Sequence, residues 1–213
     1  MRDRLIDTLG GLAHSRFLVY LMGPYKAFDV EGVLDAGDGG VDLASIPDGV
    51  DFGALVGSDV DLERREAAFD LLVHVRDRLR TDPGVNAFLA VDADVPLEEM
   101  DAATQSIEFA RASNAIVYVV PRVGDNLGVG IEVGSVLEAI FRGDDATAHR
   151  ERVVFVHESG VRSAMIAAVR DRWEARVYAY DDRDDLVRQV RLFVRDLARR
   201  ELRGDLPSLD GGE

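Results

Sequence analysis

Five short runs of apolar residues, separated by amphipathic stretches, most constrain how this chain can fold. The runs cover residues 16–22, 86–91, 114–120, 152–156 and 176–180. They are nearly continuous instead of alternating with polar residues, which is typical of strands whose two faces are both buried. Between the runs, apolar residues recur at helical spacing. This alternation predicts an α/β fold with a parallel sheet.

The stretches between the runs indicate which helices cover that sheet. We expect helices over residues 2–13, 61–80, 96–111, 128–141, 161–173 and 186–197. Right-handed crossovers leave few ways to connect five parallel strands through such helices. Our prediction is a flavodoxin-like, doubly wound, five-stranded parallel sheet in the order 2-1-3-4-5, with helices on both faces.

The length of 213 residues suits one domain. We assign residues 1–204 to a single α/β domain and residues 205–213 to a flexible tail. Residues 25–59 interrupt the regular pattern, because they are rich in Gly and Asp and hold only isolated apolar residues. A long loop of this kind is either a lid over a site or a solvated insertion.

The charge balance excludes some classes of function. Forty Asp and Glu residues against 25 Lys and Arg give a net charge of −15, and Lys26 is the only lysine. Such a chain repels phosphate, which argues against general nucleic-acid binding. The Asp- and Arg-rich composition is typical of proteins from salt-loving microbes, so we expect folding and activity to depend on molar salt. The absence of cysteine excludes disulfides and thiolate metal sites.

Targeting features are also absent from the sequence. The first ten residues are charged and lack the apolar stretch of a signal peptide. No apolar run approaches the roughly 20 residues that a membrane-spanning helix needs. We expect a cytoplasmic protein that does not bind membranes.

The loops after the first and third strands are the best candidates for a functional site. In an open parallel sheet, ligands bind beyond the carboxyl ends of the strands, at the point where the strand order reverses. The predicted order puts residues 23–25 and 122–126 at that point. Glycines at positions 124, 128, 130 and 134 then allow a ligand to approach the start of the next helix, with Glu132 in its first turns.

The residues of these two loops resemble those of nucleoside 2-deoxyribosyltransferases. Residues 19–25, Val-Tyr-Leu-Met-Gly-Pro-Tyr, are similar to the Tyr-Leu-Ala-Gly-Pro-Tyr/Phe opening of that family. Residues 126–134, Asn-Leu-Gly-Val-Gly-Ile-Glu-Val-Gly, align with its Asp-x-Gly-Thr-x-x-Glu-hydrophobic-Gly segment. The resemblance spans most of residues 16–142, and the pair of motifs in this order is moderately specific.

The resemblance implies cleavage or transfer of the N-glycosidic bond of a nucleoside or nucleotide, by a transferase or hydrolase without a cofactor or metal. Glu132 matches the nucleophilic glutamate, and Asp125 falls near an Asp that contacts the leaving base or sugar. It also implies a homo-oligomer. The candidate substrate-binding residues are Gly23, Pro24, Tyr25, Asn126, Gly128 and Gly130, to which the position of Asp92 after the second strand adds a possible sugar contact.

Three departures from the family pattern keep other functions open. Asn126 and Asn114 stand where the family has Asp, and Val129 replaces its Thr. Asn cannot protonate a leaving base. One alternative is therefore a non-catalytic nucleotide-binding, sensing or assembly module on the same fold. Another is a hydrolase of a nicotinamide dinucleotide, as in TIR-type domains, which use one glutamate.

Several further residues have simpler interpretations. Residues 157–159, His-Glu-Ser, follow the fourth strand and can line a pocket at the same edge. Tyr178 and Tyr180 alternate with apolar neighbours and indicate strand packing. The acidic residues 181–185 are expected to cap the last helix. The four histidines have no metal-ligand spacing.

Overall fold

The computed structural model describes residues 1–24, 59–122, 134, 136–141, 149–161, 166, 169–171, 175–207 and 209, with the side chains of α4 described from Glu66 onward. The predicted loop at 25–59 therefore lies outside the described residues except for Asp59, the first residue of α4. The strands are β1 (His14–Met22), β2 (Val85–Phe88), β3 (Ala115–Val120), β4 (Val153–Glu158) and β5 (Arg176–Tyr180). The helices are α1 (Arg2–Leu9), α4 (Asp59–Thr81), the 3-10 helix η2 (Ala90–Asp92), α5 (Ala102–Ala112) and α9 (Arg183–Arg203).

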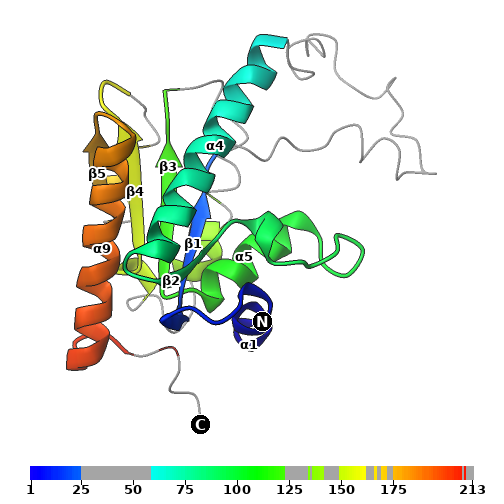
Figure 1. Ribbon diagram of the computed structural model, residues 1–213, viewed down its shortest axis with the longest axis vertical. Coiled ribbons are helices and arrows are strands. Elements are labelled where there is room, and N and C mark those ends of the chain that lie inside the picture. Colours follow the sequence, from blue (N-terminus) through cyan, green and yellow to red (C-terminus); the bar gives the residue numbers. More distant parts are fainter. Residues whose placement is uncertain are drawn as a thin grey trace.

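The five strands form one parallel sheet in the order β2-β1-β3-β4-β5 (Figure 1). This confirms the predicted flavodoxin-like order. Helices α4 and α9 pack on one face of the sheet, and α1, α5 and the helical residues 136–141 pack on the other. The predicted strand positions are close to those observed because continuous apolar runs can be buried only at the centre of such a sandwich.

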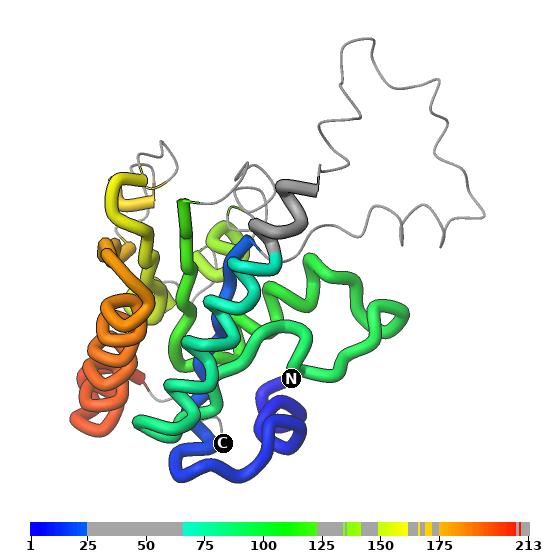
Figure 2. The backbone as a smooth tube through the Cα atoms, turned by 45° about the horizontal axis from the view of Figure 1, so that its top comes forward, coloured from blue at the N-terminus to red at the C-terminus, as the bar shows by residue number. Residues whose placement is uncertain are grey.

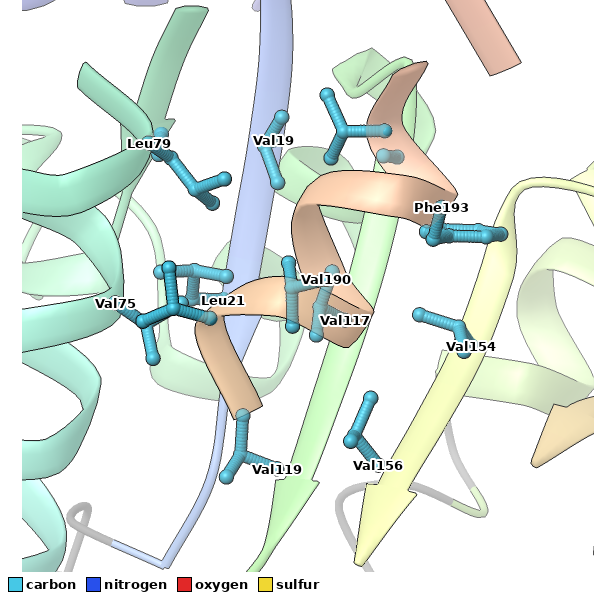
Figure 3. Close-up of a cluster of buried hydrophobic side chains, with 14 of the residues drawn as sticks. Val19, Leu21, Val75, Leu79, Val117, Val119, Val154, Val156, Val190 and Phe193 are labelled. Carbon is cyan, nitrogen blue, oxygen red and sulfur yellow. The ribbon is translucent and has the colours of Figure 1, made fainter. Parts of the chain in front are cut away.

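Side chains of successive strand residues supply the two cores in turn. Val19 and Leu21 of β1 face α4 and α9, whereas Leu18 and Tyr20 face α5. Figure 3 shows the first of these cores, in which valines of β3 and β4 meet Val190 and Phe193 of α9. The second core is rich in aromatic rings, such as the stacked pair Tyr118 and Phe155 with ring centroids 4.6 Å apart. β2 and β3 are buried along their whole length on both faces, which fixes their register in the sheet.

The start of α5 corrects the prediction of a helix over residues 96–111. The helix begins at Ala102, and η2 and a turn occupy the chain before it. The Asp101 carboxylate accepts hydrogen bonds from the backbone N–H groups of Ala103 and Thr104, each at 3.0 Å. Asp101 is thus the N-cap, because its carboxylate accepts from the first free N–H groups of the helix. Proline has no side-chain acceptor and could not cap a helix in this way.

The residues after α9 correct the prediction of a flexible tail from residue 205. Leu206 is buried against α4 and α9, and the backbone N–H of Asp205 donates to the Arg200 carbonyl at 2.9 Å. The guanidinium of the fully buried Arg152 donates to the Pro207 carbonyl. Residues 205–207 therefore belong to the folded domain, and residues 208 and 210–213 lie outside the described part of the chain.

Candidate functional site

All five strands end at the same edge of the sheet, so the residues that follow them form one surface. β1 lies between β2 and β3, which is the reversal of strand order that the sequence predicted. At that point Gly23 and Pro24 follow β1, and Pro121 and Arg122 follow β3. Tyr25, Asp125, Asn126, Gly128, Gly130 and Glu132 lie outside the described residues.

Gly23 lies in a tightly packed position. A Cβ atom at this position would lie 2.9 Å from Cδ1 of Leu72 and 3.2 Å from the backbone oxygen of Val119. The first contact is shorter than real Cβ contacts and requires the Leu72 side chain to shift, and the approach to the Val119 backbone oxygen is tighter than nine in ten real contacts, so glycine suits the close approach of α4 to the end of β1. Helix–sheet packing therefore explains this glycine without a ligand.

Asp92 is engaged within the protein. Its Oδ1 accepts a hydrogen bond from Nη1 of Arg76 at 2.6 Å, and its Oδ2 accepts one from the backbone N–H of Leu89 at 2.8 Å. The side chain is 17% exposed. Oδ1 thus holds the segment after β2 against α4, and Oδ2 stabilises the start of η2, so we leave Asp92 out of the proposed ligand contacts.

A pocket opens at the carboxyl ends of β3, β4 and β5, between the N-terminal halves of α4 and α9. Its volume is about 260 Å³. The lining residues are Ala67, Ala68, Leu71, Pro121, Glu158, Tyr180, Asp181, Asp182 and Arg183. The pocket shares the end of β3 with the predicted switch point and extends from there towards β5. Its lining combines the apolar residues Ala67, Ala68, Leu71 and Pro121 with polar residues from β4, β5 and the start of α9.

Tyr180 is the most unusual residue of this pocket. It ends β5 and is 3% exposed, yet among the described residues its hydroxyl has no hydrogen-bond partner. Burial raises the pKa of Tyr180, and the nearby Glu158 carboxylate raises it further. The phenol therefore stays protonated at neutral pH and offers a hydrogen-bond donor. A buried donor without an acceptor costs free energy, which a ligand with an acceptor group would recover.

Glu158 is held in place beside Tyr180. The two residues are register partners at the last position of the β4–β5 ladder. Oε2 of Glu158 accepts a hydrogen bond from the backbone N–H of Arg122 at 2.8 Å. This contact leaves Oε1 without a described partner, so the pocket presents a carboxylate acceptor and a phenol donor together.

Arg122 joins the loops that follow β3 and β4. Its guanidinium donates to the Ser159 carbonyl. A Cβ at Gly160, which has a φ of 86°, would lie 2.1 Å from Nη2 of Arg122. Gly160 is thus needed both for its backbone conformation and for the space that the arginine occupies. The two loops support the position of Glu158.

The start of α9 closes the pocket on the β5 side. The Asp182 carboxylate accepts a hydrogen bond from the Asp185 backbone N–H at 2.8 Å, which confirms that the acidic residues 181–185 cap the helix. Hydrogen bonding to Arg188 lowers the pKa of Asp185. Arg183 adds an exposed cation to a rim that is otherwise acidic.

Asn114 lies at the opposite edge of the sheet, just before β3 begins. Its Oδ1 accepts a hydrogen bond from the Leu18 backbone N–H at 2.9 Å, and its Nδ2 donates to the Glu201 carboxylate at 3.0 and 3.1 Å. Arg152 donates to Glu201 and to the Asn114 carbonyl. Asn114 is therefore a structural residue, and an aspartate there would face Glu201 without the amide donor.

Part of this site could be predicted from the sequence. Residues 157–159 were expected to line a pocket, and Glu158 does line it. Tyr180 packs in the core as predicted, but its pattern in the sequence did not reveal the unpartnered hydroxyl. The available signal was a tyrosine at the last position of a strand, where its hydroxyl reaches the carboxyl edge.

The described residues hold neither a metal-site cluster nor a membrane-spanning helix. No group of three or more His, Asp or Glu side chains in the described part of the chain is arranged to hold a metal ion. None of the described helices is long and apolar enough to cross a bilayer.

Comparisons with known proteins give one family. A model described as "Domain of unknown function (DUF7509)" matches residues 2–210. Comparison with curated proteins and with solved structures finds no significant match.

Proposed function

The chain belongs to the DUF7509 family, and we propose that it binds a nucleoside or nucleotide at the carboxyl edge of its sheet and cleaves or transfers the N-glycosidic bond. The observation that carries the binding part is the buried, unpartnered hydroxyl of Tyr180 beside the Glu158 carboxylate. A phenol donor next to a carboxylate acceptor suits the hydroxyl groups of a sugar or the edge of a base.

The size and place of the pocket agree with this proposal. A volume of about 260 Å³ is slightly below the range typical of drug-sized ligands, so it suits a small molecule. The pocket lies at the end of β3, where residues 123–133 continue the chain with the glycine-rich motif. The proposal combines the described pocket with a nucleophile that the motif supplies.

The chemical step rests on the resemblance to the deoxyribosyltransferases. The Glu132 carboxylate attacks the anomeric carbon, the C–N bond breaks, and its electron pair leaves with the base. Asp125 is the candidate to hold or protonate that base, since Asn126 cannot donate a proton as an acid. Water or a second base then attacks the glycosyl ester and releases Glu132. Tyr180 positions the substrate through a hydrogen bond. Its raised pKa makes it a poor general acid, so it does not transfer its proton.

The position of Asn114 removes one argument against catalysis. The resemblance aligns Asn114 with a family Asp, but Asn114 is 2% exposed and bonded within the opposite edge of the sheet. Its identity therefore does not affect a proton transfer at the carboxyl edge. Asn126 is the departure that still favours the alternative, a module that binds the ligand without cleaving it.

Release of a free base tests the proposal. The protein is incubated in molar salt with a panel of nucleosides, nucleotides and NAD, and released base is measured by chromatography. We expect release from at least one compound and a loss of about 1,000-fold or more in Glu132→Gln, because the nucleophile is removed. Glu98→Gln is the matched control, since Glu98 is exposed and remote from the pocket.

Two other results would lead to different conclusions. Binding of a panel member without release, equally strong in wild type and Glu132→Gln, would favour the binding module. Neither binding nor release for any compound would contradict the proposal as a whole.

A further inference from the structure

The outer face of α9 is unusual for a solvent-exposed helix. Its buried side is apolar, with Leu186, Val190, Phe193 and Leu197 in the core. On the opposite side, exposed residues recur at alternating spacings of four and three, the spacing of a helix that packs on another helix. These residues, which we call the α9 stripe, are Arg188, Leu192, Arg195, Arg199 and Leu202.

Two leucines of the α9 stripe are exposed to solvent. Leu192 is 56% exposed and Leu202 is 88% exposed. Figure 1 and Figure 2 both show α9 as the outermost described helix on the β5 side of the sheet. The stripe thus offers an apolar and cationic surface for a partner.

The charge of the stripe differs from that of the chain. The helix holds seven arginines against four acidic residues, whereas the whole chain has a net charge of −15. Within the described residues, Arg195 and Arg199 have no acidic side chain close enough for an ion pair. Such arginines are free to pair with carboxylates of another molecule.

The arrangement of charges around Leu192 is self-complementary. Arg188 and Asp196 each lie four residues from Leu192, on opposite sides, and Asp185 and Arg199 each lie seven residues from it. In an antiparallel pair of helices centred on Leu192, each residue faces the one at the same separation on the other side. Arg188 then faces Asp196, and Asp185 faces Arg199. Within the protomer Asp185 already pairs with Arg188 and Asp196 with Arg176, so the contacts between copies extend existing ion pairs. A parallel pair would place arginine against arginine.

We propose that α9 packs antiparallel on α9 of a second copy of this chain, around a two-fold axis at Leu192. Each contact then occurs twice, as in any isologous interface. A stable interface buries about 800 Å² per partner, and one helix of about 30 Å in length provides less than this. The dimer is therefore reversible and depends on protein concentration. This inference is independent of the proposed function.

A single cysteine tests the axis directly, because the chain has none. A disulfide needs Cα atoms about 4.4–6.8 Å apart, which residues on the axis of two packed helices can reach. We expect Leu192→Cys to form a covalent dimer on mild oxidation in molar salt. Leu202→Cys is the matched control: it is more exposed, but its two copies would lie about 30 Å apart.

A charge reversal provides the second measurement. Arg199→Asp, made in the Leu192→Cys background, puts an aspartate opposite Asp185 and breaks no ion pair within the protomer. We expect its cross-linking to slow about threefold, because exposed ion pairs contribute up to about 1 kcal/mol and molar salt screens them. The same reversal at Arg170, an exposed residue outside α9, leaves the rate unchanged. Equal cross-linking of Leu192→Cys and Leu202→Cys, no cross-linking of Leu192→Cys, or equal slowing by both reversals would overturn the proposal.

Discussion

Glu158 and Tyr180 are register partners at the last position of the β4–β5 ladder, so a carboxylate and a buried phenol lie together at the carboxyl edge of the sheet. Within the described residues the phenol has no hydrogen-bond partner. A buried hydroxyl without a partner does not stabilise the fold, and this supports the proposed ligand-binding role.

Tyr180→Phe separates the ligand-binding role of the hydroxyl from its effect on stability. Removal of an unsatisfied buried hydroxyl should leave the free energy of unfolding unchanged or raise it by up to about 1 kcal/mol. Binding of the panel compound that wild type recognises should weaken roughly tenfold. Thermal melting and calorimetric titration measure the two effects. A clear loss of stability would show that the hydroxyl has a partner within the protein.

Gly23→Ala tests the packing explanation for the glycine after β1. The new Cβ would meet Leu72 and the Val119 backbone, so we expect a loss of about 1–3 kcal/mol in the free energy of unfolding. Gly134→Ala is the control, because nothing lies within 4 Å of a Cβ there and the residue is helical. That variant should be neutral or more stable by about 0.5–1 kcal/mol. Chemical denaturation compares them, and equal effects would contradict the explanation.

Asn114→Asp restores the residue type of the resembling family and should nevertheless be harmful. It removes the amide donor to Glu201 and adds a second carboxylate at a site that is 2% exposed. We expect a loss of about 2–3 kcal/mol in stability. Any base release, measured under conditions where the variant is folded, should not increase. An increase in the turnover rate would place Asn114 in the catalytic machinery after all.

The pH dependence of stability should reflect exposed carboxylates with lowered pKa values. Hydrogen bonds from Thr104 lower the pKa of Asp101 below its ordinary 3.8, and a hydrogen bond from Arg4 lowers the pKa of Glu99 below 4.5. Groups with a depressed folded-state pKa stabilise the protein above their unfolded pKa, and this stabilisation is lost as pH falls through the folded pKa. We therefore expect the melting temperature to fall below about pH 4.

Asp101→Asn provides the control for that pH profile. Asparagine keeps an N-cap acceptor but cannot titrate. The fall in melting temperature at acidic pH should become shallower in this variant. An unchanged profile would mean that Asp101 does not contribute to the acid transition.

The strand order could be predicted because it depends on local features. Each apolar run is long enough for one buried strand, and the handedness of the crossovers then leaves few arrangements. The start of α5 was predicted less well, since Pro96 and Asp101 both resemble helix starts and only the hydrogen bonds to Ala103 and Thr104 distinguish them.

The roles of single polar residues depend on contacts distant in sequence. Asn114 bonds to Glu201, which is 87 residues away, and no local pattern reveals that pair. Asp92 accepts a hydrogen bond from Arg76 of α4, the helix that connects β1 and β2. A residue that we expected to contact a ligand therefore holds two segments of the fold together. In the sequence, Tyr180 has the pattern of an ordinary strand tyrosine. Only the pairing of β4 with β5 shows that Glu158 lies beside it.

The most direct test of the account is the covalent intermediate. A nucleoside analogue that slows the second step is incubated with the protein in molar salt, and intact-mass and peptide mass spectrometry locate the adduct. The account predicts one glycosyl group on the peptide that contains Glu132, no adduct in Glu132→Gln, and base released in equal amount. Base release without an adduct on that peptide, or an adduct on another residue, would contradict it.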